Sequence, residues 1–145
     1  NKQSLFLKAL EHYANTTIRN VRDRLSAGGS PLTNLKHLLK DWQDLHSQPG
    51  SCGCMLGTNI ADFNTNDAAI AKVFRVYLQQ MEDAFTTALN QAQAAGELSL
   101  SANPRNLARL LLCTTQGMAL LGRVMDDGTT LEGAVETVIA LLENS

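Results

Sequence analysis

The sequence predicts an all-α fold, a helical bundle of about six helices. Apolar residues recur every three or four positions through most of the 145 residues, and glycine, proline or capping side chains separate these stretches. Strand signals are nearly absent from the sequence. A hydrophobic content of 44% and a charged content of 18% are those of a folded chain with a sizeable core. We therefore expect residues 1–145 to form one domain.

The first half of the chain predicts three helices. The first runs from about Lys2 to Ala27 and stops at two glycines, and Ser30 then caps a second helix that starts with Pro31. A short, weakly polar third helix is expected over residues 52–63. The apolar stripe of the first helix is Phe6, Leu10, Tyr13, Thr17, Val21 and Leu25, and that of the second is Leu35, Leu38, Leu39, Trp42 and Leu45.

The second half predicts three longer helices. Asn66 and Asp67 cap a helix that reaches about Ala95, and Asn103-Pro104 starts another that ends near Met125. Thr129 and Glu132 have the spacing of a capping box for the last helix. The buried stripes are Ile70, Val73, Phe74, Tyr77, Met81, Phe85 and Leu89 in the first of these helices and Leu131, Val135, Val138, Ile139 and Leu142 in the last.

The helix that starts at Pro104 is apolar nearly all round. Its only charges before Asp126 are Arg105, Arg109 and Arg123, and such a helix is usually buried on more than one side. A second copy of the chain would supply the second side, since two-fold homodimers dominate among oligomers. The alternative is a central helix covered by its own domain. The residues expected to form this homodimer interface are Leu110, Thr114, Gly117, Leu121, Val135, Val138 and Leu142.

Composition excludes several other classes. A net charge of −2 without a basic cluster argues against a self-sufficient DNA-binding domain. The longest apolar run is too short for a membrane span, and no signal peptide opens the chain, so its three cysteines are expected to be reduced thiols in the cytoplasm.

No catalytic serine elbow, phosphate loop or Glu-x-x-His pair appears, so we expect neither enzyme, metal nor cofactor. The histidines, at separate places, are expected to be solvent-facing or structural: His12, His37 and His46.

Three short motifs together resemble one known family. They are Asn1-Lys2-Gln3-Ser4-Leu5-Phe6, Gly53-Cys54-Met55-Leu56 and Ala94-Ala95-Gly96-Glu97-Leu98. With them, essentially the whole chain resembles the C-terminal half of TetR-family transcriptional regulators. The resemblance implies an effector-binding and dimerisation domain of a DNA-binding repressor, with a helix-turn-helix upstream of Asn1 that binds operator DNA.

The resemblance also implies how such a domain signals. In relatives, a lysine at the position of Lys2 often touches a DNA phosphate at the helix N-terminus. A small molecule would tilt the first helix and change the distance between the DNA-binding helix-turn-helix units of the two copies in a dimer. These units must lie about 34–36 Å apart on DNA. The repressor would then leave its operator.

The expected ligand site combines apolar walls with a few polar groups, as small-molecule sites do. Its residues are Trp42, Met55, Asn59, Phe63, Phe74, Tyr77, Met81 and Gln116. The alternative is that these residues are ordinary core. Because no charged residue falls within the expected core, we expect an apolar or weakly polar effector.

Cys52-Gly53-Cys54 offers a different function. A cysteine after glycine at a helix start would have its thiolate favoured by the helix dipole, and some relatives that sense electrophiles carry their sensing cysteine at the place of Cys54. A thiol-based regulator that uses Cys54 and Cys52 is therefore one alternative, and small buried structural cysteines are another. Two sulfurs alone make a poor metal site. Cys113 is expected in the core, and a dimerisation module without effector remains a third reading.

Overall fold

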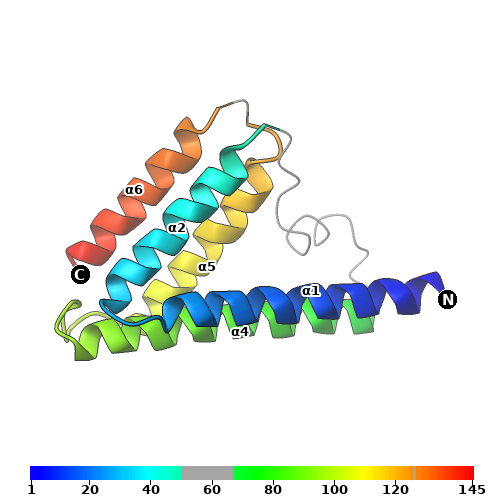
Figure 1. The fold of residues 1–145 in the computed structure, drawn as a ribbon, viewed down its shortest axis with the longest axis horizontal. Coiled ribbons are helices and arrows are strands. Elements are labelled where there is room, and N and C mark those ends of the chain that lie inside the picture. The colour runs from blue at the N-terminus through cyan, green and yellow to red at the C-terminus, as the bar shows by residue number, and fades with distance from the viewer. Residues whose placement is uncertain (50–66, 126) are drawn as a thin grey trace.

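Two long helices form one layer of the molecule, and three shorter helices cross one end of it (Figure 1). The long pair is α1 (Lys2–Leu25) and α4 (Ala68–Ala94); the second layer holds α2 (Pro31–Ser47), α5 (Pro104–Leu121) and α6 (Thr129–Glu143). The computed structural model describes residues 1–49, 67–125 and 127–145. The all-α prediction is confirmed for these residues, and the short helix predicted over 52–63 lies outside them.

Capping side chains set three of the helix starts, as the sequence predicts. The Ser30 hydroxyl accepts a hydrogen bond from the backbone N–H of Thr33 at 3.1 Å. A carboxylate oxygen of Asp67 accepts from two backbone N–H groups of the first turn of α4, at 3.0 and 3.1 Å. The side chain of Asn103 does the same for α5 at 3.0 Å. Each such cap stabilises a helix by about 1 kcal/mol.

Two predicted boundaries are wrong, and neighbouring groups explain both. Thr129 is the first residue of α6 and not its cap, because the preceding Asp127 accepts from the backbone N–H of Thr129 at 2.9 Å. Helix α5 ends at Leu121 and does not reach Met125. Gly122 caps α5 where the chain meets α2: a Cβ on Gly122 would lie 2.4 Å from the backbone oxygen of His46.

One continuous core joins the five helices that the structure describes. Its largest completely buried side chains include Tyr77 and Phe85 of α4, and burial of a large apolar side chain stabilises the fold by about 1.5–3 kcal/mol. The buried positions of α1 are Leu10, Ala14, Ile18, Val21 and Leu25. Tyr13 and Thr17, which the sequence pattern assigns to the same stripe, are only half-buried, and they lie at its edge.

Polar contacts fasten the two layers at the turn between α4 and α5. The Glu97 carboxylate accepts from the backbone N–H of Leu32 at 3.3 Å and from the hydroxyl of Ser30, so it holds the N-terminus of α2. Arg105 of α5 binds Glu82 at 3.0 Å and Asp83 at 2.7 Å on α4. Among the described helices, none is both long and apolar enough to cross a membrane.

Candidate functional site

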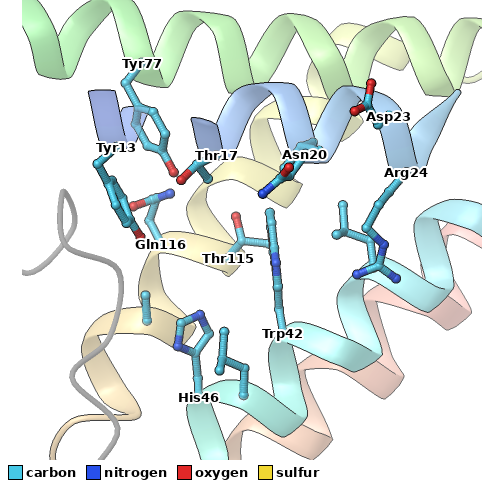
Figure 2. A pocket seen from close by; sticks show the side chains of 14 residues that line it. Tyr13, Thr17, Asn20, Asp23, Arg24, Trp42, His46, Tyr77, Thr115 and Gln116 are labelled. Atoms are coloured by element: carbon cyan, nitrogen blue, oxygen red, sulfur yellow. The ribbon is translucent and has the colours of Figure 1, made fainter. Parts of the chain in front are cut away.

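A cavity of about 520 Å³ lies where α1 crosses the second layer (Figure 2). This volume falls within the usual range for small-molecule sites. Four helices line it, with Tyr77 as the sole contribution of α4. The lining residues are Tyr13, Thr17, Asn20, Val21, Asp23, Arg24, Leu38, Trp42, Leu45, His46, Tyr77, Thr115, Gln116 and Ala119.

Helix α1 forms one long wall of the cavity. Tyr13, Thr17, Asn20 and Arg24 follow one another at steps of three or four residues, so they share one face of the helix. This face lies beside the buried stripe of α1, which anchors the helix to α4. A molecule in the cavity would therefore touch α1 over about three helical turns.

Trp42 divides the cavity into two unlike ends. It rises from α2 toward Asn20 on α1, with Gln116 and His46 on one side and Arg24 on the other (Figure 2). Its ring meets the buried ring of Phe85 edge-on, with centroids 6.3 Å apart and planes at 73°. Such aromatic pairs add about 0.5–1.5 kcal/mol to the burial of the rings, which fixes the position of the indole.

The end beside His46 and Gln116 is neutral and holds unpaired polar atoms. The Nδ1 atom of His46 and the Oε1 atom of Gln116 are both buried without a hydrogen-bond partner. His46 is 8% exposed, and its burial lowers the pKa of the imidazole, so the ring is neutral at pH 7. The neighbouring Thr115 is satisfied, because its hydroxyl donates to the backbone oxygen of Leu111 at 2.8 Å. An unpaired buried polar atom costs about 1–3 kcal/mol, so two in one cavity call for an explanation.

The other end of the cavity is charged and open to solvent. Arg24 makes an ion pair with Asp41 at 2.5 Å, and both side chains are substantially exposed. Exposed pairs of this kind contribute about 0–1 kcal/mol. The charges therefore mark the mouth of the cavity and leave its buried end without a full charge.

Three of the residues predicted for a ligand site line this cavity: Trp42, Tyr77 and Gln116. Phe74 and Met81 do not line it, because their side chains are buried in the core between the helices. The remaining predicted residues lie outside the described residues, as do both cysteines of the proposed thiol sensor. They are Met55, Asn59 and Phe63, with Cys52 and Cys54.

Sequence reasoning did not single out several lining residues. Tyr13 and Thr17 are assigned by periodicity to the core stripe of α1, and His46 to a structural role. A usable signal was present in α1, where Thr17 and Asn20 place polar groups directly beside an apolar stripe. The other two histidines, His12 and His37, are exposed.

The outer face of α5 is an apolar stripe on the surface. Leu110 is 40% exposed and Leu121 39%, with Thr114 and Gly117 between them on the same face. A Cβ added to Gly117 would meet nothing within 4 Å. Cys113 is also exposed on this stripe, so its expected place in the core is wrong. The opposite face holds the buried residues of α5, which are Ala108, Leu111, Thr115, Met118 and Ala119.

Helix α6 turns three of its predicted interface residues inward. Val135, Val138 and Leu142 are buried in the core of their own chain. A side chain that is covered in this way has no surface to offer a second copy, so these three do not fit the expected interface. The exposed face of α6 carries Leu141, which is 50% exposed, and Gly133.

At the far end of α1, Lys2 is exposed in the first turn of the helix. Asn1 caps this turn and accepts from the backbone N–H of Ser4 at 2.8 Å. Elsewhere, the residues that the structure describes bring together no group of three or more His, Cys, Asp or Glu side chains able to hold a metal ion.

Comparisons with known proteins agree with one another. A family model described as "Tetracyclin repressor-like, C-terminal domain" matches residues 31–138. The chain is 25% identical over 144 residues to the "Uncharacterized HTH-type transcriptional regulator YezE" of Bacillus subtilis, over 98% of this chain and 74% of that protein. The solved structure of a TetR transcriptional regulator from Chloroflexus aurantiacus superimposes with a TM-score of 0.81 at 19% identity. It covers 98% of this chain and 72% of its own, and this likeness shows the fold.

Proposed function

Because this chain belongs to the family of tetracyclin repressor-like C-terminal domains, we propose that it binds a small effector and dimerises within a DNA-binding repressor. Members of this family are transcription regulators and not enzymes. The parent protein would bind operator DNA in the cytoplasm through a helix-turn-helix that leads into Asn1. Lys2, exposed at the start of α1, would then lie close to a DNA phosphate.

This proposal rests on how much of the cavity lining comes from α1. Six of the fourteen lining residues belong to this helix, whose other end would lead to the helix-turn-helix. The helix has 24 residues and is about 36 Å long. A tilt of about 5° about its C-terminal end would move its N-terminus by about 3 Å. Such a shift would alter DNA binding, because the two helix-turn-helix units of a dimer have to fit successive major grooves about 34–36 Å apart.

Ligand binding would shift DNA affinity only if the two shapes of the domain differ in ligand affinity. The cavity offers a reason for such a difference. A ligand that contacts Thr17 on α1 and Gln116 on α5 spans the two layers of the fold, so it would favour one angle between them. Effector release of the repressor from DNA then follows from linkage.

Dimerisation would use the apolar stripe of α5 together with the exposed face of α6. Exposed leucines lie along one surface of α5, on either side of a glycine that has open space around it. This arrangement suits the close approach of a second helix. The proposed contact residues are Leu110, Thr114, Gly117, Leu121, Gly133 and Leu141. A second copy is the occupant, because a two-fold axis beside α5 pairs this stripe with itself.

The proposal is tested on the intact regulator, bound to DNA from its own promoter region. A collection of small aromatic compounds is screened for release of the DNA by fluorescence anisotropy. Thr17→Phe fills the cavity, whereas Thr87→Phe adds the same ring at an exposed position of α4 outside it. Release that is lost in Thr17→Phe and kept in Thr87→Phe supports an effector site in this cavity. Release that is equal in both variants, or a failure of every compound to bind, contradicts it.

A further inference from the structure

Two unpaired polar atoms belong to residues that line the same cavity. Within the described residues, three buried side-chain atoms lack a hydrogen-bond partner, and two of them line this cavity: Nδ1 of His46 and Oε1 of Gln116. Buried polar atoms in folded proteins are nearly always paired. Their concentration at one end of a cavity indicates that their partner is a molecule that binds there.

Among the described residues, none donates to or accepts from these two atoms. His46 lies in the last turn of α2, and its backbone rests against Gly122, where even one added carbon would come within 2.4 Å. This contact fixes the position of the His46 backbone, from which the imidazole extends. The nearest hydroxyl along α5, that of Thr115, donates to its own helix at Leu111.

The lining of this end sets the charge of the ligand. The imidazole is neutral because burial lowers its pKa, and the amide of Gln116 carries no charge. Arg24 and Asp23 lie beyond Trp42, at the other end of the cavity (Figure 2). A charged group beside Gln116 would lose its hydration without a partner of opposite charge, which is strongly unfavourable.

The aromatic side chains at this end of the cavity set the shape of the ligand. Trp42, Tyr13 and Tyr77 come from three different helices and surround this end of the cavity. Flat apolar rings are favoured against such walls by offset or edge-to-face contacts.

We propose that the cavity binds a neutral, flat aromatic molecule that carries a hydroxyl group, with the hydroxyl directed at Gln116. The O–H donates to Oε1 of Gln116, and a hydroxyl oxygen can also accept from His46 when Nδ1 carries the ring proton. This inference rests on the proposed function of the cavity as an effector site. It adds the chemical class of the effector.

Three probes of one shape test the proposal: 2-naphthol, 2-methoxynaphthalene and 2-naphthoate. The first is neutral with a donor, the second is neutral without one, and the third is an anion. Calorimetry on the whole chain gives the affinities, and the fluorescence of Trp42, the sole tryptophan of the sequence, places each probe in the cavity. We expect 2-naphthol to bind about tenfold more tightly than 2-methoxynaphthalene, and 2-naphthoate to bind more weakly than either.

A matched pair of variants assigns the preference to one atom. Gln116→Met removes the acceptor and should bring the affinity ratio of the two neutral probes to about one. Gln91→Met makes the same change at an exposed site of α4 outside the cavity and should keep the wild-type ratio. The comparison of probes on the unaltered chain needs no variant, so a folding defect in Gln116→Met would not remove the test.

The outcomes separate this inference from the proposed function. Equal affinity for the two neutral probes overturns the assignment of a hydroxyl ligand, and a preference that survives in Gln116→Met overturns Gln116 as the acceptor. Either result leaves the effector cavity standing. Failure of all three probes to bind overturns the cavity as an effector site for aromatic molecules.

Discussion

Replacing Gly122 with alanine would push a methyl group into the backbone of a neighbouring helix. The added Cβ would lie 2.4 Å from the backbone oxygen of His46 and 3.1 Å from its Cβ. Ordinary contact begins at 3.4 Å, so α2 or α5 has to move by about 1 Å. Overpacking of this kind costs about 1–3 kcal/mol. Gly122 has φ −59°, which alanine adopts freely, so a gain of about 0.4–1 kcal/mol from the unfolded chain offsets part of this cost.

The expected result is a loss of about 1–2 kcal/mol in the free energy of unfolding. Urea unfolding at one fixed protein concentration measures it, since the stability of a dimer depends on concentration. In a chain of this length the melting temperature would fall by about 3–8 °C. Gly28→Ala is the matched control, because a Cβ there meets nothing within 4 Å and its φ is not positive. It should leave the stability unchanged or slightly raised.

The same variant tests the link between this contact and the cavity. Because Gly122 positions His46, Gly122→Ala should also weaken the binding of 2-naphthol. Gly29→Ala serves as the control of similar cost, since Gly29 has φ +91° and lies in the turn before α2, at the opposite end of that helix from His46. It should lower stability and leave probe affinity unchanged. A Gly122→Ala protein as stable as the wild type would contradict the steric conflict with His46.

Three further predictions concern other parts of the fold. Glu97→Gln should lower the free energy of unfolding by about 1 kcal/mol, because a charged acceptor at the N-terminus of α2 is lost; an unchanged melting curve would contradict this. His46 has a folded-state pKa below its unfolded value of 6.5, so the unfolded chain binds more protons below that pH. Stability should therefore fall as the pH is lowered through 6.5 toward the folded pKa, and His46→Gln should show a smaller fall in urea unfolding at pH 7.5 and 5.5. Leu121→Glu puts a charge on the exposed stripe of α5 and should give monomers in sedimentation equilibrium, whereas Leu5→Glu on α1 should stay dimeric; dimers of Leu121→Glu would rule out this interface.

Local chemistry made much of the fold predictable. Ser30, Asp67 and Asn103 act on backbone groups within three residues, so their effect is legible from the sequence alone. The end of α5 is not of this kind. It depends on the approach of His46, which is far away in the sequence, to Gly122.

The candidate site was predictable only in part, for a related reason. Helical periodicity shows which face of α4 is covered but cannot distinguish a covered face from one that borders a cavity. Tyr77 borders the cavity, whereas Phe74 and Met81 have the same pattern and belong to the core. On α6, periodicity correctly finds Val135 as part of an apolar face. Whether the same chain or a second copy covers that face depends on the tertiary structure.

We propose that a molecule held against α1 alters the positions of the two DNA-binding units of the dimer. Pulsed EPR tests it most directly, with a spin label at Leu5→Cys on the exposed first turns of α1 and the three native cysteines replaced by serine. The distance between the labels of two copies is measured without and with saturating 2-naphthol. We predict one defined distance in the dimer; each label moves by about 3 Å for each 5° of tilt, so the distance between the two labels changes by up to about 6 Å. An unchanged distance in protein that calorimetry shows to hold the probe would contradict it.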